Sequence, residues 1–201
     1  MRDRIKRCVH LLAWVAVTPS VMSWMLRSRI LGPDRALEGS TQAWALCPGL
    51  IGQYLRRAFL CRTLTFCADD ATIEFGTLFS SASASIGHRA YIGPRCHLGW
   101  SVIEADVLLA AGVHVPSGAH THGIEDLSTA IRDQPTLKQP VRIGRGSWVG
   151  SAAVVLADVG CDAVVAAGAV VTRPIPDRTI AAGVPARVLR HRDPQVHERP
   201  A

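Results

Sequence analysis

The sequence predicts a parallel β-helix, a solenoid of short strands that coil around one axis. Aliphatic residues followed by glycine recur every six positions, a step that fits neither the 3.6-residue period of a helix nor the two-residue period of an ordinary strand. Two such series flank a long break, one from Ile86-Gly87 to Leu98-Gly99 and one from Ile143-Gly144 to Val155. Aromatic residues make up only 5% of the 201-residue chain, which suits a core of small aliphatic side chains.

Four triplets of aliphatic residues are expected to point into the solenoid. They are Ile86, Ile92 and Leu98; Ile103, Leu109 and Val115; Ile143, Val149 and Val155; and Val159, Val165 and Val171. Each triplet would make one coil of about eighteen residues, so we expect about four coils between residues 71 and 173. Parallel crossovers are right-handed by default, and the spacing alone gives no reason to depart from that.

The segment before the repeats, residues 1–70, is predicted to be helical. The stretch from Cys8 to Val17 is apolar, Thr18-Pro19-Ser20 interrupts it, and Val21 to Leu31 resumes around two arginines. A spanning helix needs about 20 apolar residues, and this run is too short and too interrupted for one. We therefore expect a segment that lies on the membrane or re-enters it, with a signal peptide and a buried packing helix as alternatives.

A second helix is expected around residues 50–62, where apolar residues recur at helical spacing and arginines lie between them. It is suited either to an anionic membrane surface or to capping the unpaired strand edges of the first coil, and the two roles are compatible. The net charge of +6 is concentrated at the two ends of the chain. The repeats carry no basic stripe interleaved with aromatic residues, so a nucleic-acid partner is not expected.

The break between the two series, residues 116–140, is the candidate functional segment. It holds His120 and His122, followed by Glu125 and Asp126. Histidine is the side chain best suited to accept a proton at neutral pH, and an adjacent carboxylate would fix its tautomer. A single loop histidine is usually only solvated, but a pair beside acidic residues at a solenoid interruption indicates a site.

Three stretches carry a resemblance to a known family: GVHVPSGAH (112–120), VRIGRGSWVGSAAVVLADVG (141–160) and VVAAGAVVTRPIPDRTIAAGVPARVLR (164–190). The chain resembles the hexapeptide-repeat acyltransferases, which include maltose, galactoside and polysaccharide O-acetyltransferases. The resemblance covers residues 71–192 and leaves 193–201 as a tail. It implies left-handed coils, a homotrimer, acetyl-CoA bound between neighbouring subunits, and no metal.

The resemblance also points to a catalytic histidine. The family's base follows a G-V-x-[VIL]-x4-H stretch, which Gly112, Val113, Val115 and His120 match. Counting back from the G-I-E-D sequence downstream favours His122 instead. We prefer His120, because the rigid coil before it should fix its geometry, and keep His122 as the alternative.

Eight positions match the family's cofactor-binding residues. They are Trp148, Gly150, Ser151, Ala167, Gly168, Thr172, Arg173 and Arg187. The family's W-[IV]-G-[SA] motif lines the CoA arm, and the last arginine would approach a phosphate through charge-assisted hydrogen bonds. The sequence departs from the family at Glu104, where glycine is usual, and at Val159-Gly160, which comes two residues early.

The function implied is direct transfer of an acetyl group from acetyl-CoA to a sugar hydroxyl, with histidine as general base and no acyl-enzyme. The expected acceptor is a cell-surface or exopolysaccharide precursor. Such precursors, when linked to lipid, are assembled at the cytoplasmic face of the membrane. With the apolar leader, this predicts a cytoplasmic protein that is peripheral on the inner face of the membrane. The alternatives are a γ-class carbonic anhydrase, with zinc held by some of His97, His114, His120 and His122, and an inert scaffold.

Overall fold

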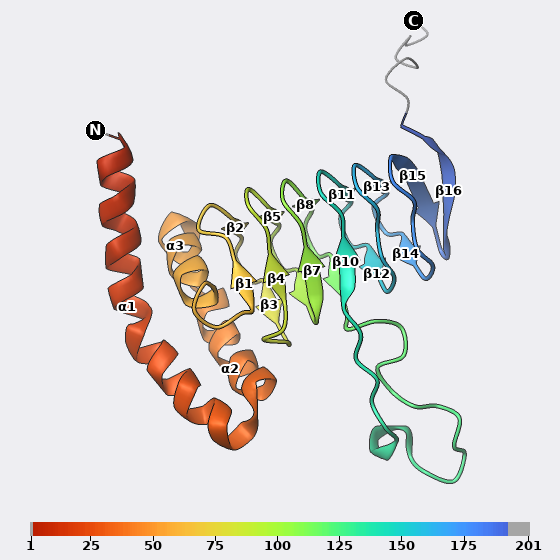
Figure 1. The fold of residues 1–201 in the computed structure, drawn as a ribbon, viewed down its shortest axis with the longest axis horizontal. Helices are drawn as coiled ribbons and strands as arrows, with labels where there is room; N and C mark the ends of the chain where they lie inside the picture. Colours follow the sequence, from red (N-terminus) through yellow and green to blue (C-terminus); the bar gives the residue numbers. More distant parts are fainter. Residues whose placement is uncertain (1, 193–201) are drawn as a thin grey trace, which may run out of the picture.

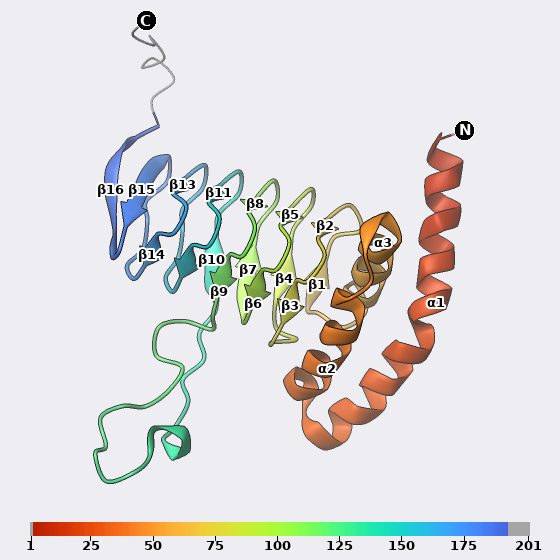
Figure 2. The same ribbon diagram turned by 180° about the vertical axis from the view of Figure 1, so that it is seen from behind.

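The computed structural model describes residues 2–192, with side chains from residue 8 onward, and the predicted tail at 193–201 lies outside the described residues. A helical cap, formed by α1 (Arg2–Leu31), α2 (Pro33–Ala45) and α3 (Gly49–Leu60), covers one end of a parallel β-helix (Figure 1). Seen from behind, the cap and the final hairpin lie at opposite ends of the solenoid, and one long loop projects from its side (Figure 2).

The solenoid has three parallel sheets, here called A, B and C, and each full coil contributes to each of them. Sheet A contains β1 (Phe66–Cys67), β4 (Ser85–Ile86), β7 (Ser101–Ile103) and β10 (Val141–Ile143). Sheet B contains β2 (Thr72–Ile73), β5 (Tyr91–Ile92), β8 (Leu108–Leu109), β11 (Trp148–Val149), β13 (Val164–Val165), β15 (Thr179–Gly183) and β16 (Ala186–His191). Sheet C contains β3 (Leu78–Phe79), β6 (His97–Leu98), β9 (His114–Val115), β12 (Val154–Val155) and β14 (Val170–Val171). Only β15 and β16 pair antiparallel among these described strands.

The twelve residues expected to point inward are all buried, and each is at most 1% exposed. Equivalent residues stack in register, as Ile86 pairs with Ile103 and Ile92 with Leu109. The structure adds a coil before the four expected ones, built on Cys67, Ile73 and Phe79. The sequence hides this coil because glycine follows none of these three residues and seven positions separate Phe79 from Ile86. A partial sixth coil ends in the β15–β16 hairpin.

Two of the three corners of a coil are tight turns. The corner between sheets A and B (the AB corner) and the one between sheets B and C (the BC corner) hold residues with positive φ, among them Arg89 (54°), Asp106 (61°), Arg95 (57°) and Ala152 (58°). Side chains other than glycine adopt this conformation at a cost of about 1–2 kcal/mol. The stacked backbone hydrogen bonds of the coils offset that cost.

Glu104, which departs from the family pattern, joins the coils on either side of the long loop. Its carboxylate accepts hydrogen bonds from the Arg142 side chain (2.7 Å) and from the backbone N–H of Arg145 (2.9 Å). The carboxylate also raises the pKa of Arg142, first through the hydrogen bond and then through its charge. Because β7 and β10 pair directly across the insertion, the loop leaves the β-helix continuous.

The helical cap is packed onto the first coil, as expected for α3. The buried Arg56 donates from its guanidinium to the carbonyl oxygens of Ile73 (3.0 Å) and Cys47 (2.5 Å), and burial lowers its pKa. Thr18-Pro19-Ser20, which interrupts the apolar run in the sequence, lies inside one continuous helix, because α1 continues through Pro19. The expectation that this run is too short and too interrupted for a spanning helix is therefore wrong as to length and composition. By length and composition alone, Cys8–Leu31 is long and apolar enough to cross a membrane.

Candidate functional site

The long loop leaves sheet C after β9 and returns at β10. Its two ends are tied together at the neck, where the N–H of Gln139 donates to the carbonyl oxygen of Ser117 (3.0 Å). Farther out, the N–H of Gly123 donates to the carbonyl oxygen of Pro135 (2.9 Å), and a 3₁₀ turn (Ile131–Asp133) follows in the tip. The neck therefore fixes where the histidine-bearing segment starts.

An ion pair anchors the loop to the helical cap. Lys138 Nζ lies 3.0 Å from Asp34 Oδ2 at the start of α2. The other oxygen of Asp34 accepts a hydrogen bond from the backbone N–H of Ala82 (2.9 Å), which holds the carboxylate against the first coil. The loop, α2 and sheet C thus enclose a common space.

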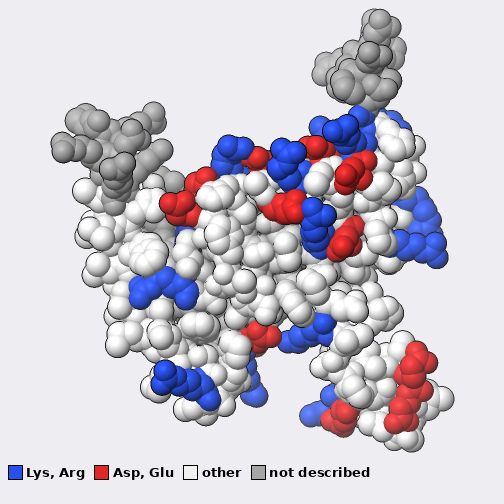
Figure 3. Space-filling model, viewed as in Figure 1, with Lys and Arg blue, Asp and Glu red and all other residues white. Residues whose placement is uncertain are grey.

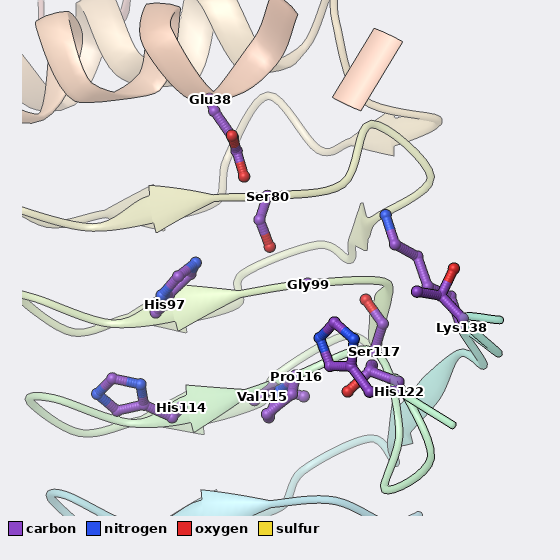
Figure 4. Close-up of a pocket in the computed structure, with 12 residues that line it drawn as sticks. Glu38, Ser80, His97, Gly99, His114, Val115, Pro116, Ser117, His122 and Lys138 are labelled. Atoms are coloured by element: carbon purple, nitrogen blue, oxygen red, sulfur yellow. The ribbon is translucent and has the colours of Figure 1, made fainter. Parts of the chain in front are cut away.

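That space is a pocket of about 310 Å³ (Figure 4). Its walls come from α2, three successive coils and the loop. They are formed by Glu38, Ser80, His97, Gly99, His114, Val115, Pro116, Ser117, Thr121, His122, Thr136 and Lys138. Both predicted catalytic histidines are exposed, and of the two His122 lines this pocket whereas His120 does not.

Two further histidines stand side by side on the pocket floor. His97 and His114 occupy equivalent positions of β6 and β9, and their ring centroids are 6.0 Å apart. Burial lowers the pKa of His97, the neighbouring His114 lowers it further, and the carboxylate of Glu38 acts in the opposite direction. A neutral imidazole at this position can accept a hydrogen bond from a ligand hydroxyl.

The acidic residues of the loop do not orient its histidines in this chain. Asp126 accepts hydrogen bonds from the hydroxyl (2.6 Å) and the N–H (2.8 Å) of Ser128. Bonds from Ser128 and then Thr129 lower the pKa of Asp126 to about 2. Within residues 2–192, no carboxylate is hydrogen-bonded to His120 or His122, so the expected tautomer-fixing contact is not formed here.

Five of the eight predicted cofactor residues lie along the BC corner. The N–H of Gly150 donates to the carbonyl oxygen of Val165 (2.7 Å), and the N–H of Gly168 donates to that of Ser151 (2.8 Å). Arg187 lies opposite Ala182, one coil beyond. The corner therefore presents small side chains and backbone in a line that ends at an exposed cation. The fifth residue, Ala167, lies on the next coil beside Gly150.

The other three predicted cofactor residues lie elsewhere. Trp148 is half exposed on sheet B, next to the BC corner. Thr172 and Arg173 follow β14 at the corner between sheets C and A (the CA corner). The long loop leaves the β-helix at the same corner of an earlier coil. Four residue steps of an extended strand, about 13 Å, separate the two corners within a coil. One chain therefore does not bring all eight residues together.

Some site residues were not predicted from sequence. Glu38 and Lys138 enter the pocket from segments far apart in the chain, and no motif marks either one. A shallow hollow of about 410 Å³ continues the BC corner toward the cap, lined by Phe75, Pro94, Arg95, Ala111 and Gly112. Its signal in the sequence is the recurrence of small residues at this corner.

Within the part of the chain that the structure describes, His97, His114, His120 and His122 do not form a group with metal-ligand spacing. Among the described residues, the group with the required spacing is Asp69, Asp70 and His88, all exposed. It lies at the AB corner, and His88 Nδ1 is 3.1 Å from Asp70 Oδ1. The zinc ligands considered for a carbonic anhydrase are not members of it.

Comparison with known proteins finds acetyltransferases, and no protein-family model matches the chain. A probable acetyltransferase of Mycobacterium tuberculosis is 41% identical over 73 residues, which are 35% of this chain and 24% of that protein. The galactoside O-acetyltransferase of Escherichia coli is 45% identical over 53 residues, 25% of this chain and 26% of that protein. The chain thus matches about a quarter of the length of each of these relatives.

Solved structures share the fold over a longer range. A galactoside acetyltransferase in complex with coenzyme A superposes with a TM-score of 0.64 at 22% identity, covering 80% of this chain and 81% of that one. A maltose O-acetyltransferase from Clostridium difficile gives 0.65 at 20% identity, covering 80% and 88%. The parallel coils are therefore those of the left-handed β-helix, as the sequence resemblance implied. The chain is thus similar in sequence to acetyltransferases over part of its length, and similar in fold to hexapeptide-repeat acetyltransferases.

Proposed function

We propose that this protein is an O-acetyltransferase that transfers the acetyl group of acetyl-CoA to a sugar hydroxyl. The observation that carries the proposal is the pocket between α2, sheet C and the long loop, which holds a loop histidine in a wall of polar side chains. A pocket of about 310 Å³ lies at the small end of the range for ligand sites. Hydroxyls, imidazoles, Glu38 and Lys138 suit an acceptor rich in hydroxyl groups.

The donor is proposed to lie along the BC corner. Small residues there let the CoA arm approach the backbone, and Arg187 offers a cation to a phosphate. Since the corner and the loop lie at opposite edges of sheet C, the corner of one subunit and the histidine loop of a neighbour would meet in a trimer. A homotrimer is therefore part of the proposal.

The chemistry requires one base and one oxyanion site. A loop histidine accepts the proton of the acceptor hydroxyl, whose oxygen attacks the thioester carbonyl carbon. Backbone N–H groups stabilise the resulting oxyanion. The carbon–sulfur bond then breaks, and the imidazolium returns its proton to the CoA thiolate. The motif spacing assigns the base to His120, and the pocket geometry supports His122.

The acceptor is proposed to be a precursor of a cell-surface polysaccharide. The galactoside and maltose acetyltransferases among the relatives carry sugar acceptors in their names, which supports this class. The apolar α1 supports a location at the cytoplasmic face of the membrane, where a lipid-linked saccharide would be met.

Two single variants test the base. With acetyl-CoA and a panel of saccharides, replacing the base by alanine should lower turnover by about a hundred- to ten-thousand-fold. We expect that loss in one of His120→Ala and His122→Ala, with a much smaller loss in the other. Acetyl-CoA affinity should be little changed in both, because the proton removed belongs to the acceptor. Wild-type turnover in both variants would refute a loop histidine as the base.

A further inference from the structure

Helix α1 turns a stripe of small apolar residues and several polar side chains toward the protein. Its inner stripe, Ala13, Val17 and Val21, is buried against the rest of the cap. Polar contacts hold α1 to α2 and α3, three of them on this side and one at Thr18 on the edge of the opposite side. They join Arg57 Nη2 to His10 Nε2 (2.8 Å), Arg62 Nη1 to Thr18 Oγ1 (2.9 Å), Trp44 Nε1 to Ser20 Oγ (3.1 Å) and Arg27 Nη2 to Ser40 Oγ (2.7 Å).

The opposite side of α1 is apolar and exposed. We call it the outer face; its residues are between 51% and 78% exposed. They are Leu11, Leu12, Val15, Met22, Met25, Leu26 and Ile30. At 100° per residue they occupy a sector of about 140°. Thr18 lies in the same sector, and its hydroxyl donates to the carbonyl oxygen of Trp14 (2.9 Å). The charged residue of α1 in this sector is Arg29, in the last turn of the helix.

On a helix at a water-soluble surface the side that faces away from the core is polar. In α1 that side is apolar as well. An apolar surface of this extent on one helix marks an interaction site. Its surroundings are basic: from residue 8 to residue 62 the acidic residues are Asp34 and Glu38, and both face the loop and the pocket. In Figure 3 the helical end is largely white with separate blue groups, and red lies nearer the coils.

We propose that the outer face binds the surface of an anionic lipid bilayer, with α1 lying in the interface rather than crossing the membrane. The segment Cys8–Leu31 is long enough to span. Spanning would, however, either break the contacts of α1 with Arg57 and Arg62 or carry those guanidinium groups into hydrocarbon, where a charge is costly. Lying flat keeps them intact and places arginines near lipid headgroups.

This binding mode sets the orientation of the whole molecule. Helix α1 runs across the end of the β-helix, so the solenoid axis would stand on the membrane (Figures 1 and 2). One helix layer and up to three coils, together about 25 Å, would separate the pocket from the headgroups. Whether this distance lets the pocket reach a lipid-linked acceptor depends on the proposed function. The membrane contact itself does not depend on it.

A vesicle flotation experiment with the full-length protein tests the inference. The probe is a vesicle of about 70% phosphatidylcholine and 30% phosphatidylglycerol, compared with phosphatidylcholine alone. The test variant, Val15→Glu with Leu26→Glu, changes two exposed positions of the outer face. Its matched control, Val188→Glu with Leu189→Glu, makes the same replacements at exposed positions of β16. We expect wild type and control to float with the anionic vesicles, and the test variant to lose at least tenfold in bound fraction.

Three results would overturn the inference. Equal flotation of test and control variants would remove the outer face from the contact. Resistance of the cell-bound protein to alkaline carbonate extraction would show that α1 spans. The outer face would instead belong to an interface with a second copy if wild type failed to bind vesicles but formed a concentration-dependent dimer that the test variant did not form. Binding of acetyl-CoA, followed by thermal shift, should be the same in wild type and the test variant, so failure of the enzymatic proposal is read separately.

Discussion

Gly150 and Gly168 differ sharply in the space that a methyl group would find, although both lie at the BC corner on neighbouring coils. A Cβ at Gly150 would lie 2.4 Å from the backbone N of Ala167 and 2.8 Å from its Cα. Ordinary contact needs more than 3.4 Å, so the next coil must move by about 1 Å. A Cβ at Gly168 would meet nothing within 4 Å, and its φ of +68° imposes the only strain.

Gly150→Ala is therefore expected to be the far more damaging change. Overpacking costs about 1–3 kcal/mol, and loss of the two short backbone hydrogen bonds at this corner adds about 1 kcal/mol each, giving about 3–5 kcal/mol. Gly168→Ala should cost about 1–2 kcal/mol, the price of a left-handed alanine. Urea unfolding followed by circular dichroism, at equal protein concentration because assembly contributes to stability, gives both values.

Equal destabilisation by the two substitutions would refute this reasoning, since only the close approach of the coils distinguishes them. When equal amounts of folded protein are compared, acetyl-CoA binding should rank the two variants in the opposite order, with Gly168→Ala the more affected. The methyl group of Gly168→Ala would project into the proposed CoA path. We expect weaker acetyl-CoA binding by that variant, measured by calorimetry, with little loss of stability.

Three further predictions concern the cap and the loop. Arg56→Ala should destabilise the fold by about 3 kcal/mol, because buried carbonyl oxygens lose their donor, and a thermal melt measures this. Lys138→Ala should release the loop from Asp34 and raise the Michaelis constant for the acceptor more than it lowers turnover. Because the pKa of Asp126 is lowered to about 2, its contribution to loop order is complete above about pH 4 and is lost as the pH falls toward 2. The protection of the Ser128 N–H from hydrogen exchange should follow that window, and exchange should be faster in Asp126→Asn than in wild type above about pH 4 but not near pH 2.

The core was predictable from sequence because its rule is local. One side chain in every six turns inward, so twelve positions could be named before the structure was known, and all are buried. The first coil was not predicted, because Cys67 and Phe79 are not part of an aliphatic-glycine pair. The histidine loop was found for a similar reason, since the repeat stops at Pro116 and resumes at Val141.

The pocket and the character of α1 depended on tertiary contacts. Glu38 and Lys138 belong to the pocket only because α2 packs beside the coils and Asp34 holds the loop. The same packing carries α1 through Pro19 and turns several of its polar side chains inward. The sequence alone determined the coiled architecture, the buried stack and the position of the candidate loop, because each follows from the spacing of neighbouring residues, whereas that spacing left the handedness of the coils open. Only the tertiary structure decided which side chains share a pocket and which face of α1 is left uncovered, because these depend on contacts between segments far apart in the chain.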